Sequence, residues 1–178
     1  MARDETAGPG THGAAGGLMR VAFEAIDARD LEALATLWDD HTVDVFLALQ
    51  REVVGERDLR DFFTEMFTAV PDLAFTTEEI HEVDETIAVG QWHLVGTFSG
   101  GPFQGIEPTG RPLDLRGIDV MRFEGGVLRR NDVYFDGLAF ARQVGLLPAA
   151  GSPADRAMMS AFNGLTGARR SVASWLGR

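Results

Sequence analysis

The sequence predicts an α+β domain with helices on one face of an antiparallel sheet. Apolar residues recur every three or four positions through much of residues 18–70, which is typical of helices. They alternate with polar residues through much of residues 73–135, which is typical of strands. A run of helices followed by a run of strands indicates this class. The 178 residues and 45% hydrophobic content suit one domain with a sizeable core.

The N-terminal part is expected to begin as a tail and continue as two helices. Residues 1–16 consist largely of Gly, Ala, Thr and Pro without periodicity, which predicts a disordered tail. Helical spacing runs through residues 18–40 and breaks near Arg29. Asp30 is suited to cap the second helix, because its carboxylate would lie at the positive end of the helix dipole.

The middle of the chain predicts one more helix and then mostly strands. Residues 41–49 are rich in β-forming residues and predict a strand. Residues 55–72 predict a helix whose apolar stripe comprises Leu59, Phe62, Phe63, Met66 and Phe67. Beyond it, the pattern predicts strands that are joined by an acidic turn at residues 83–85 and a Gly-rich hairpin turn at residues 124–126.

The C-terminal part is expected to close the domain and then leave it. A short helix follows Asp136, which is suited as its N-cap. We expect the domain to span residues 17–147 and residues 148–178 to form a linker and a helical extension. The apolar residues of the extension are Met158, Met159, Phe162, Leu165, Val172 and Trp175. We expect it to pack on the domain or on a partner chain.

Composition excludes several classes of function. A formal net charge of -11 repels phosphate, so neither nucleic acid nor an anionic membrane is an expected partner. The absence of Cys excludes disulfides and thiolate sites, and the absence of Lys excludes Schiff-base chemistry. No apolar run approaches the ~20 residues of a membrane helix. The N-terminus lacks the apolar segment of a signal peptide, so we expect a cytoplasmic protein.

The stretch GIDVMRF, residues 117–123, places an aspartate in a predicted strand. Alternate residues of a strand share a face, so Asp119 lies on the apolar face with Met121 and Phe123. Burial there would disfavour the charged form and raise the pKa of Asp119, so that this residue could exchange a proton near neutral pH. The alternatives are a carboxylate that is satisfied by an arginine or a backbone donor, and a strand that faces the other way.

The preceding strand offers a second candidate set. Gln91 and His93 share one face, whereas Trp92 and Phe98 share the other. If the first face lined a pocket, His93 could orient a carbonyl or exchange protons beside Asp119, since histidine titrates near neutral pH. The alternative for His93 is a position on the protein surface. Trp92 is more typical of a core or an interface than of a substrate contact.

The order of elements and the segment GIEPTGRPLDLRGIDVMRFEGGVLRRNDVYFDGLAFARQVGLLP, residues 105–148, resemble the SnoaL-like polyketide cyclase group of the nuclear transport factor 2-like superfamily. The matching points are the PTGR loop at residues 108–111, the strand-turn-strand RFEGGVL at residues 122–128, and the closing D-x-x-x-x-x-R-Q-x-G at residues 136–145. The resemblance covers residues 18–147. It is specific for fold and weak for reaction, because this fold hosts isomerases, dehydratases, epoxide hydrolases, cyclases and binding modules.

The resemblance implies a cone, in which a curved antiparallel sheet wraps around three helices and leaves a deep apolar pocket. Cyclases of this group close a ring by an aldol step without metal or cofactor, and they use an aspartate that Asp119 matches best. By comparison with relatives, the strand face with Asn131 and Phe135 also lines the pocket. Taking the resemblance and the strand patterns together, we expect Asp119 and His93 to be catalytic. The expected substrate-binding residues are Gln91, Trp92, Asn131, Phe135, Met121 and Phe63.

Differences from the catalytic residues of related enzymes reduce the number of reactions that we expect. Ketosteroid isomerases add a tyrosine and a base at positions that fall on Ala22 and Val45 here, although Asp44 next to Val45 leaves the register open. The only tyrosine is Tyr134, so that mechanism is not expected.

Epoxide hydrolases of this fold use an Asp-Arg-Asp set. Its positions fall on Gln91, His93 and either Val133 or Asp132, so the set is absent. His41 lies close to Asp39, Asp40 and Asp44, but a helix end and a strand would splay these side chains apart. We therefore expect neither a metal nor a cofactor.

The sequence thus predicts a cofactor-independent cyclase or isomerase that acts by aspartate acid–base chemistry on a hydrophobic, oxygenated, polyketide-like small molecule. The alternative from another class is a non-catalytic binding or dimerisation module of the same fold, and an epoxide hydrolase is a minor one. We also expect a homodimer, on the reasoning that the sheet face with Trp92 and Phe98 is exposed.

Overall fold

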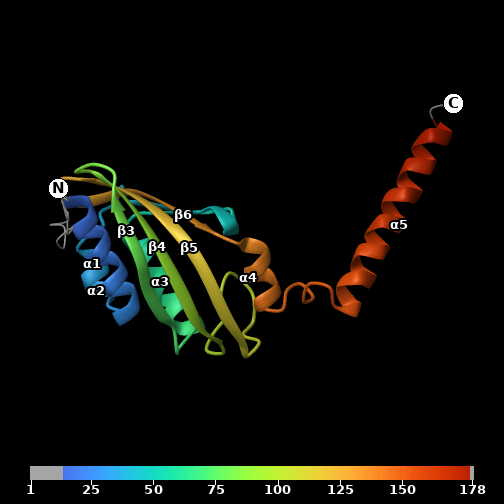
Figure 1. Ribbon diagram of the computed structural model, residues 1–178, viewed down its shortest axis with the longest axis horizontal. Coiled ribbons are helices and arrows are strands. Elements are labelled where there is room, and N and C mark those ends of the chain that lie inside the picture. Colours follow the sequence, from blue (N-terminus) through green and yellow to red (C-terminus); the bar gives the residue numbers. More distant parts are fainter. Residues whose placement is uncertain (1–13, 177–178) are drawn as a thin grey trace, which may run out of the picture.

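The computed structural model describes the backbone of residues 14–176 and the side chains of residues 14–170 (Figure 1). The tail that we expected over residues 1–16 lies mostly outside the described residues, and its last three residues are already helical. The expected apolar side chains of Val172 and Trp175 also lie outside them.

Three helices lie on the concave side of the sheet: α1 (Ala14–Ala28), α2 (Leu31–Ala35) and α3 (Glu56–Ala69). The chain breaks between α1 and α2 at Arg29, whose φ of 54° is incompatible with a continuing helix. The side chain of Asp30 then accepts a hydrogen bond from the backbone N–H of Ala33. The predicted break and the predicted cap are both confirmed.

The sheet has six strands in the order β2-β1-β6-β5-β4-β3. The strands are β1 (Val43–Phe46), β2 (Arg51–Val54), β3 (Ala74–Glu82), β4 (Ile87–Phe98), β5 (Arg111–Glu124) and β6 (Val127–Phe135). All neighbouring pairs are antiparallel except β1 and β6, which run parallel. The predicted α+β class and the curved sheet are confirmed, whereas β2 was not predicted. The strand expected over residues 41–49 ends early, because a 3-10 turn, η1 (Leu47–Leu49), leads into β2.

Both expected hairpin turns are present. The carboxylate of Asp84 accepts hydrogen bonds from the backbone N–H groups of Thr86 and Ile87 and so fixes the acidic turn between β3 and β4. Gly125 and Gly126 have φ values of 59° and 85°, which favour glycine, in the turn between β5 and β6. These hairpins set the register of β3 against β4 and of β5 against β6.

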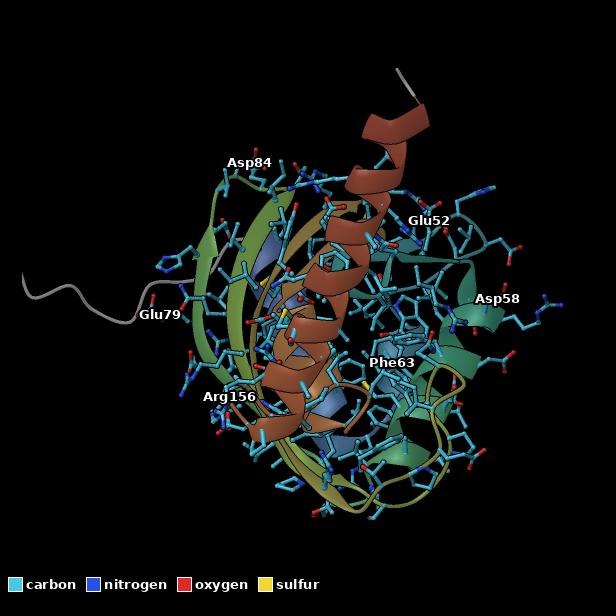
Figure 2. All side chains as sticks on the ribbon, turned by 90° about the vertical axis from the view of Figure 1, so that its right-hand side faces the viewer. Glu52, Asp58, Phe63, Glu79, Asp84 and Arg156 are labelled. Atoms are coloured by element: carbon cyan, nitrogen blue, oxygen red, sulfur yellow. The ribbon has the colours of Figure 1, made fainter. Side chains whose placement is uncertain are left out.

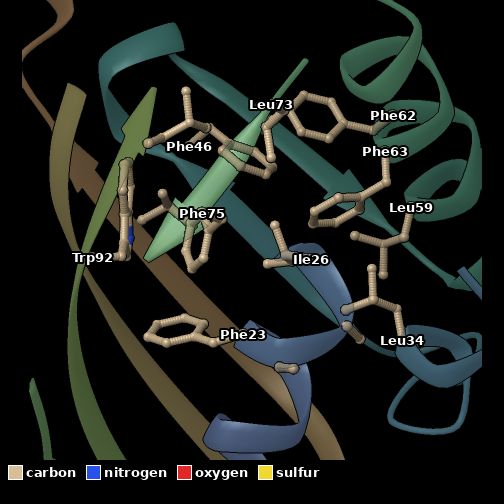
Figure 3. Close-up of a cluster of buried hydrophobic side chains, with 14 of the residues drawn as sticks. Phe23, Ile26, Leu34, Phe46, Leu59, Phe62, Phe63, Leu73, Phe75 and Trp92 are labelled. Atoms are coloured by element: carbon tan, nitrogen blue, oxygen red, sulfur yellow. The ribbon is translucent and has the colours of Figure 1, made fainter. Parts of the chain in front are cut away.

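The core lies between the concave face of the sheet and the three helices. Figure 3 shows that the rings of Phe23, Phe63, Phe75 and Trp92 point toward this shared interior from α1, α3, β3 and β4. Phe23 and Phe75 pack edge to face at 5.2 Å between ring centroids. Charged side chains such as Glu79 lie on the outside (Figure 2). The burial of this many aromatic rings is the main favourable contribution to folding.

The C-terminal helices differ in their packing. Helix α4 (Gly137–Gln143) begins at Asp136, whose side chain caps it as predicted. Helix α5 (Pro153–Leu176) extends away from the domain (Figure 1), and the side chains of Phe162 and Leu165 are 65% and 64% exposed. Of the two packings expected for the extension, packing on its own domain is not seen for these side chains, and packing on a partner chain stays a prediction. No helix in the described part of the chain is long and apolar enough to cross a membrane.

Candidate functional site

A cavity of about 110 Å³ opens within the core, between the helices and the inner face of the sheet. This volume is several times the ~10–15 Å³ that one water molecule requires on the same scale. The residues that line the cavity are apolar apart from Asp44, Asp119 and Asn131. The cavity thus combines a hydrocarbon surface with one polar cluster, as small-molecule sites typically do.

Strand register brings the three polar side chains together. Asp44 on β1 lies opposite Asn131 on β6, which lies opposite Met121 on β5. Asp119 lies two residues before Met121 and opposite Val133. Residues paired across strands point to the same face, and so do residues two apart on one strand. All of these side chains therefore face the cavity.

Both oxygens of the Asp119 carboxylate accept a hydrogen bond. The indole Nε1 of Trp92 donates to Oδ1 at 2.8 Å, and the amide Nδ2 of Asn131 donates to Oδ2 at 3.0 Å. The side chain of Trp92 lies on the inner face of β4, opposite Gly117 of β5. A Cβ at Gly117 would lie only 2.1 Å from the indole ring. The missing side chain therefore lets the indole lie across β5 and reach Asp119.

Burial has the largest effect on the pKa of Asp119, whose surface is 4% exposed. It raises the pKa of Asp119 to about 6, although the hydrogen bonds from Trp92 and Asn131 lower it in part. A carboxyl group with this pKa is mostly ionised at neutral pH and is easily protonated. It therefore suits a group that takes up and returns a proton.

Asp44 is the residue of the site that sequence reasoning missed. It is 2% exposed, and burial raises its pKa well above the usual range. The negative charge of Asp119 adds to this rise, and a hydrogen bond with the side chain of Asn131 opposes it. Oδ1 of Asp44 is buried without a hydrogen-bond partner. The available signal was strand alternation, since Asp44 and the buried Phe46 share one face of β1.

Six of the eight site residues expected from the sequence line the cavity: Asp119, Trp92, Asn131, Phe135, Met121 and Phe63. They come from α3, β4, β5 and β6, so elements far apart in the sequence build one wall. Their roles in binding or catalysis stay predictions.

The other two expected residues, Gln91 and His93, lie on the outer face of β4, so their predicted place beside Asp119 is wrong. The strand directs its larger apolar side chains, Trp92 and Leu94, inward, and alternation then forces the residues between them outward. Nε2 of His93 lies 2.7 Å from a carboxylate oxygen of Asp114 on the outer face.

The sheet face with Trp92 and Phe98, which we predicted as the basis of a homodimer, is not exposed. Trp92 and Phe98 are 5% and 2% exposed, so they do not form a free sheet face. The homodimer itself stays a prediction.

The structure also places the positions at which ketosteroid isomerases and epoxide hydrolases of this fold carry catalytic residues. Asp44, rather than Val45, faces the cavity, which resolves the register on the first strand. Ala22 lines the cavity from α1, and Tyr134 is 47% exposed. Asp132 lies on the outer face, where a guanidinium nitrogen of Arg122 lies 2.7 Å from its carboxylate. The cavity therefore has no Asp-Arg-Asp set among its lining residues.

The acidic residues around His41 do not converge. Asp44 points into the cavity, whereas a carboxylate oxygen of Asp39 accepts a hydrogen bond from Arg129 at 2.5 Å. Within residues 14–170, no group of three or more His, Asp or Glu side chains is arranged to hold a metal ion.

Comparison with known families identifies the chain. A family model described as SnoaL-like polyketide cyclase matches residues 17–144. The chain belongs to the SnoaL-like polyketide cyclase family. The resemblance seen in the sequence is thereby confirmed, and membership supports a cyclase- or isomerase-type function. The comparison with curated protein sequences found no match.

Several solved structures share this fold. A candidate SnoaL-like polyketide cyclase from Jannaschia sp. CCS1 is 20% identical with a TM-score of 0.66, over 79% of this chain and 100% of that one. IdmH from Streptomyces antibioticus, described as a candidate polyketide cyclase, is 20% identical with a TM-score of 0.60, over 72% and 96%. TsrD from Streptomyces laurentii is 25% identical with a TM-score of 0.62, over 74% and 94%.

Proposed function

We propose that this family member is a cofactor-independent cyclase or isomerase in which Asp119 performs acid–base chemistry on a hydrophobic, polyketide-like small molecule. The observation that carries the proposal is a buried carboxyl group at the wall of an apolar cavity, with a pKa of about 6. The two hydrogen bonds from Trp92 and Asn131 fix both carboxylate oxygens in place. A base that is held in one orientation needs little reorganisation during proton transfer.

The chemistry begins with an acidic C–H bond beside a substrate carbonyl. The ionised Asp119 takes this proton, and the electron pair of the C–H bond forms an enolate. In a cyclase, the enolate carbon then attacks a second carbonyl of the same molecule, which forms a C–C bond and an alkoxide that takes up a proton. In an isomerase, the proton returns to a different carbon. Both outcomes need one positioned carboxyl group to transfer the proton. General acid–base catalysis of this kind typically raises the reaction rate ~10²–10⁴-fold.

The lining of the cavity restricts the substrate. No arginine or histidine among the described residues lines it, and its two titratable groups are both acids. An anionic substrate would meet no compensating charge in an apolar environment. We therefore expect a neutral molecule, such as an ester or a ketone, with its reacting oxygens near the polar cluster and flat hydrocarbon against the aromatic walls.

A non-catalytic binding module is the second candidate, since an apolar cavity alone explains ligand binding. The two candidates differ in the effect of Asp119→Asn on turnover of a panel of neutral aromatic polyketide esters. We expect at least ~10²-fold lower kcat with the fold and ligand affinity nearly unchanged. Asp132→Asn, which alters an outer-face aspartate of β6, is the matched control and should leave kcat unchanged. Ligand binding without turnover by the wild type would favour the binding module.

We also propose that the chain forms a homodimer, and α5 is the element that supports this proposal. Its exposed apolar side chains include Met159, Phe162 and Leu165, which have no covering element within the described chain. Contiguous exposed apolar side chains are typical of association surfaces. Sedimentation velocity should give a dimer, and a monomer at micromolar concentration would refute the proposal. The cytoplasmic location stays a prediction.

A further inference from the structure

Among the described residues that line the cavity, two carry carboxyl groups and none is positively charged. The lining residues come from α1, α2, α3, α4 and the inner face of the sheet, and Asp44 and Asp119 are the only titratable ones among them. The charge of Asp119 acts on Asp44, so the two groups are coupled. Two buried carboxylates in apolar surroundings repel each other and lose their hydration, so such a pair retains a proton on one member.

The hydrogen-bond donors decide which member keeps the proton. Asp119 accepts the indole N–H of Trp92 and the amide N–H of Asn131, one on each oxygen. Hydrogen bonds that are donated to a carboxylate stabilise its ionised form. A protonated carboxyl oxygen is itself a donor, so it benefits less from neighbouring N–H groups. Among the described residues, Asp44 has a hydrogen bond with the side chain of Asn131 alone, and its Oδ1 is buried and unpartnered, which is costly for an ionised group but suits an oxygen that carries a proton.

We propose that Asp44 is a second acid–base residue, which carries the proton and acts as the acid while Asp119 is the ionised base. This inference rests on the proposed function and extends it. Asp44 lines the cavity, and its unpartnered Oδ1 is the oxygen that would carry the proton and donate it to a substrate oxygen. The first strand thereby supplies a catalytic group, and Asn131 connects the two carboxyl groups as a positioning residue.

The assignment gives a balanced ring-closing step. Asp119 takes the proton from the carbon beside the first carbonyl, and the resulting enolate carbon forms a C–C bond with the second carbonyl carbon. The C=O π bond breaks, and its oxygen takes the proton of Asp44 as negative charge develops. The step leaves Asp119 protonated and Asp44 ionised. After product release, transfer of one proton from Asp119 to Asp44 through water restores the starting state.

The test is a pH titration of aspartate side-chain carboxyl carbons by NMR, with ¹³C-labelled wild type, Asp44→Asn and Asp119→Asn. In the wild type, we expect one carboxyl group to titrate near pH 6 and a second one at higher pH. The first transition should vanish in Asp119→Asn and stay near pH 6 in Asp44→Asn, because the group that ionises first has a neutral neighbour. The second should vanish in Asp44→Asn and move to lower pH in Asp119→Asn, because its charged neighbour is gone.

Two results would overturn the assignment. If the Asp119 transition falls toward the ordinary aspartate range in Asp44→Asn, Asp44 ionises first and is the base. If both groups titrate in the ordinary range in the wild type, the pair holds no proton. Either variant alone gives the order, so a folding failure of one leaves the test intact, and Asp132→Asn should change neither transition. The titration needs no substrate, so its outcome is separate from that of the turnover assay.

Discussion

Gly117 determines whether the indole of Trp92 can reach Asp119. Gly117 has no side chain, so the indole of Trp92 can pack directly against its backbone. A Cβ at Gly117 would lie 2.1 Å from the indole. The hydrogen bond between Trp92 and Asp119 therefore depends on a residue that makes no polar contact itself. At this scale, small changes should alter the site without altering the fold.

Gly117→Ala should displace the indole and break its hydrogen bond to Asp119. Overpacking of a core position typically costs ~1–3 kcal/mol. Urea unfolding should show this loss, and Trp fluorescence should shift as the indole changes its surroundings. Gly17→Ala is the matched control, because nothing lies within 4 Å of a Cβ there. That change should stabilise α1 by ~0.5–1 kcal/mol. An unchanged stability of Gly117→Ala would contradict the close approach of Trp92.

Trp92→Phe should raise the pKa of Asp119 above its wild-type value. The substitution keeps an aromatic ring in the wall but removes the N–H that stabilises the ionised carboxylate. The pH dependence of kcat/KM, or the carboxyl carbon shift of Asp119, measures the change. Trp38→Phe serves as the control, because Trp38 also lines the cavity but stacks on Phe63. A pKa that is equal in Trp92→Phe and the wild type would show that the indole does not support the carboxylate.

Individual site residues could be predicted only where one face of a strand is clearly apolar. Asp119 shares its face with Met121 and Phe123, so alternation was sufficient to place it in the interior. On β4 both faces carry apolar residues, and the face with Gln91 and His93 was chosen wrongly. Asp44 was missed because β1 has only four residues, too few for alternation to decide its inner face.

Among the secondary-structure elements, local sequence signals predicted the helices and the hairpins. The position of β2 and the separation of α5 from the domain depend on contacts between distant segments. Asp30, Asp136 and the Gly125–Gly126 turn mark element boundaries that depend on neighbouring residues alone. Strand β2 is short, and its place at the sheet edge follows from pairing with β1, which no local pattern reveals. The separation of α5 from the domain is likewise a property of tertiary packing.

Removal of residues 151–178 should leave the domain almost unchanged in stability. The described side chains of α5 are mostly exposed, and its base is tied to α4 by an ion pair between Arg142 and Asp155 at 3.6 Å. The two side chains are only 27% and 13% exposed, but removal of the whole segment also exposes Arg142 to solvent, so we expect a loss of about 1 kcal/mol or less. Thermal and urea unfolding of the shortened and full-length chains measure the difference. A loss of several kcal/mol that does not depend on protein concentration would mean that α5 packs on the domain in solution, because a loss that comes from dimer dissociation varies with concentration.

For the whole molecule, the buried carboxyl group of Asp119 makes stability depend on pH. The unfolded chain ionises Asp119 near pH 3.9, whereas the folded protein does so near pH 6. Between these values the folded state binds more protons, so this contribution to the free energy of unfolding falls as the pH rises. The decline amounts to about 3 kcal/mol.

Comparison with Asp119→Asn isolates this contribution from the other carboxyl groups. The stability of the wild type relative to the variant should fall by about 2 kcal/mol from pH 4 to pH 7, as measured by urea unfolding at each pH. The raised pKa of Asp44 should extend the decline to higher pH. A relative stability that stays constant over this range would indicate a solvated carboxylate, and one that rises would indicate an ion-paired carboxylate.

The measurement that tests the account most directly is the pKa of Asp119 in the wild-type protein, from the pH titration of its ¹³C-labelled carboxyl group. A value near 6 is predicted, and it would place a desolvated proton acceptor at the wall of the cavity. A value at or below the ordinary ~3.9 would contradict this, because such a group would be solvated or ion-paired and unsuited to acid–base catalysis near neutral pH.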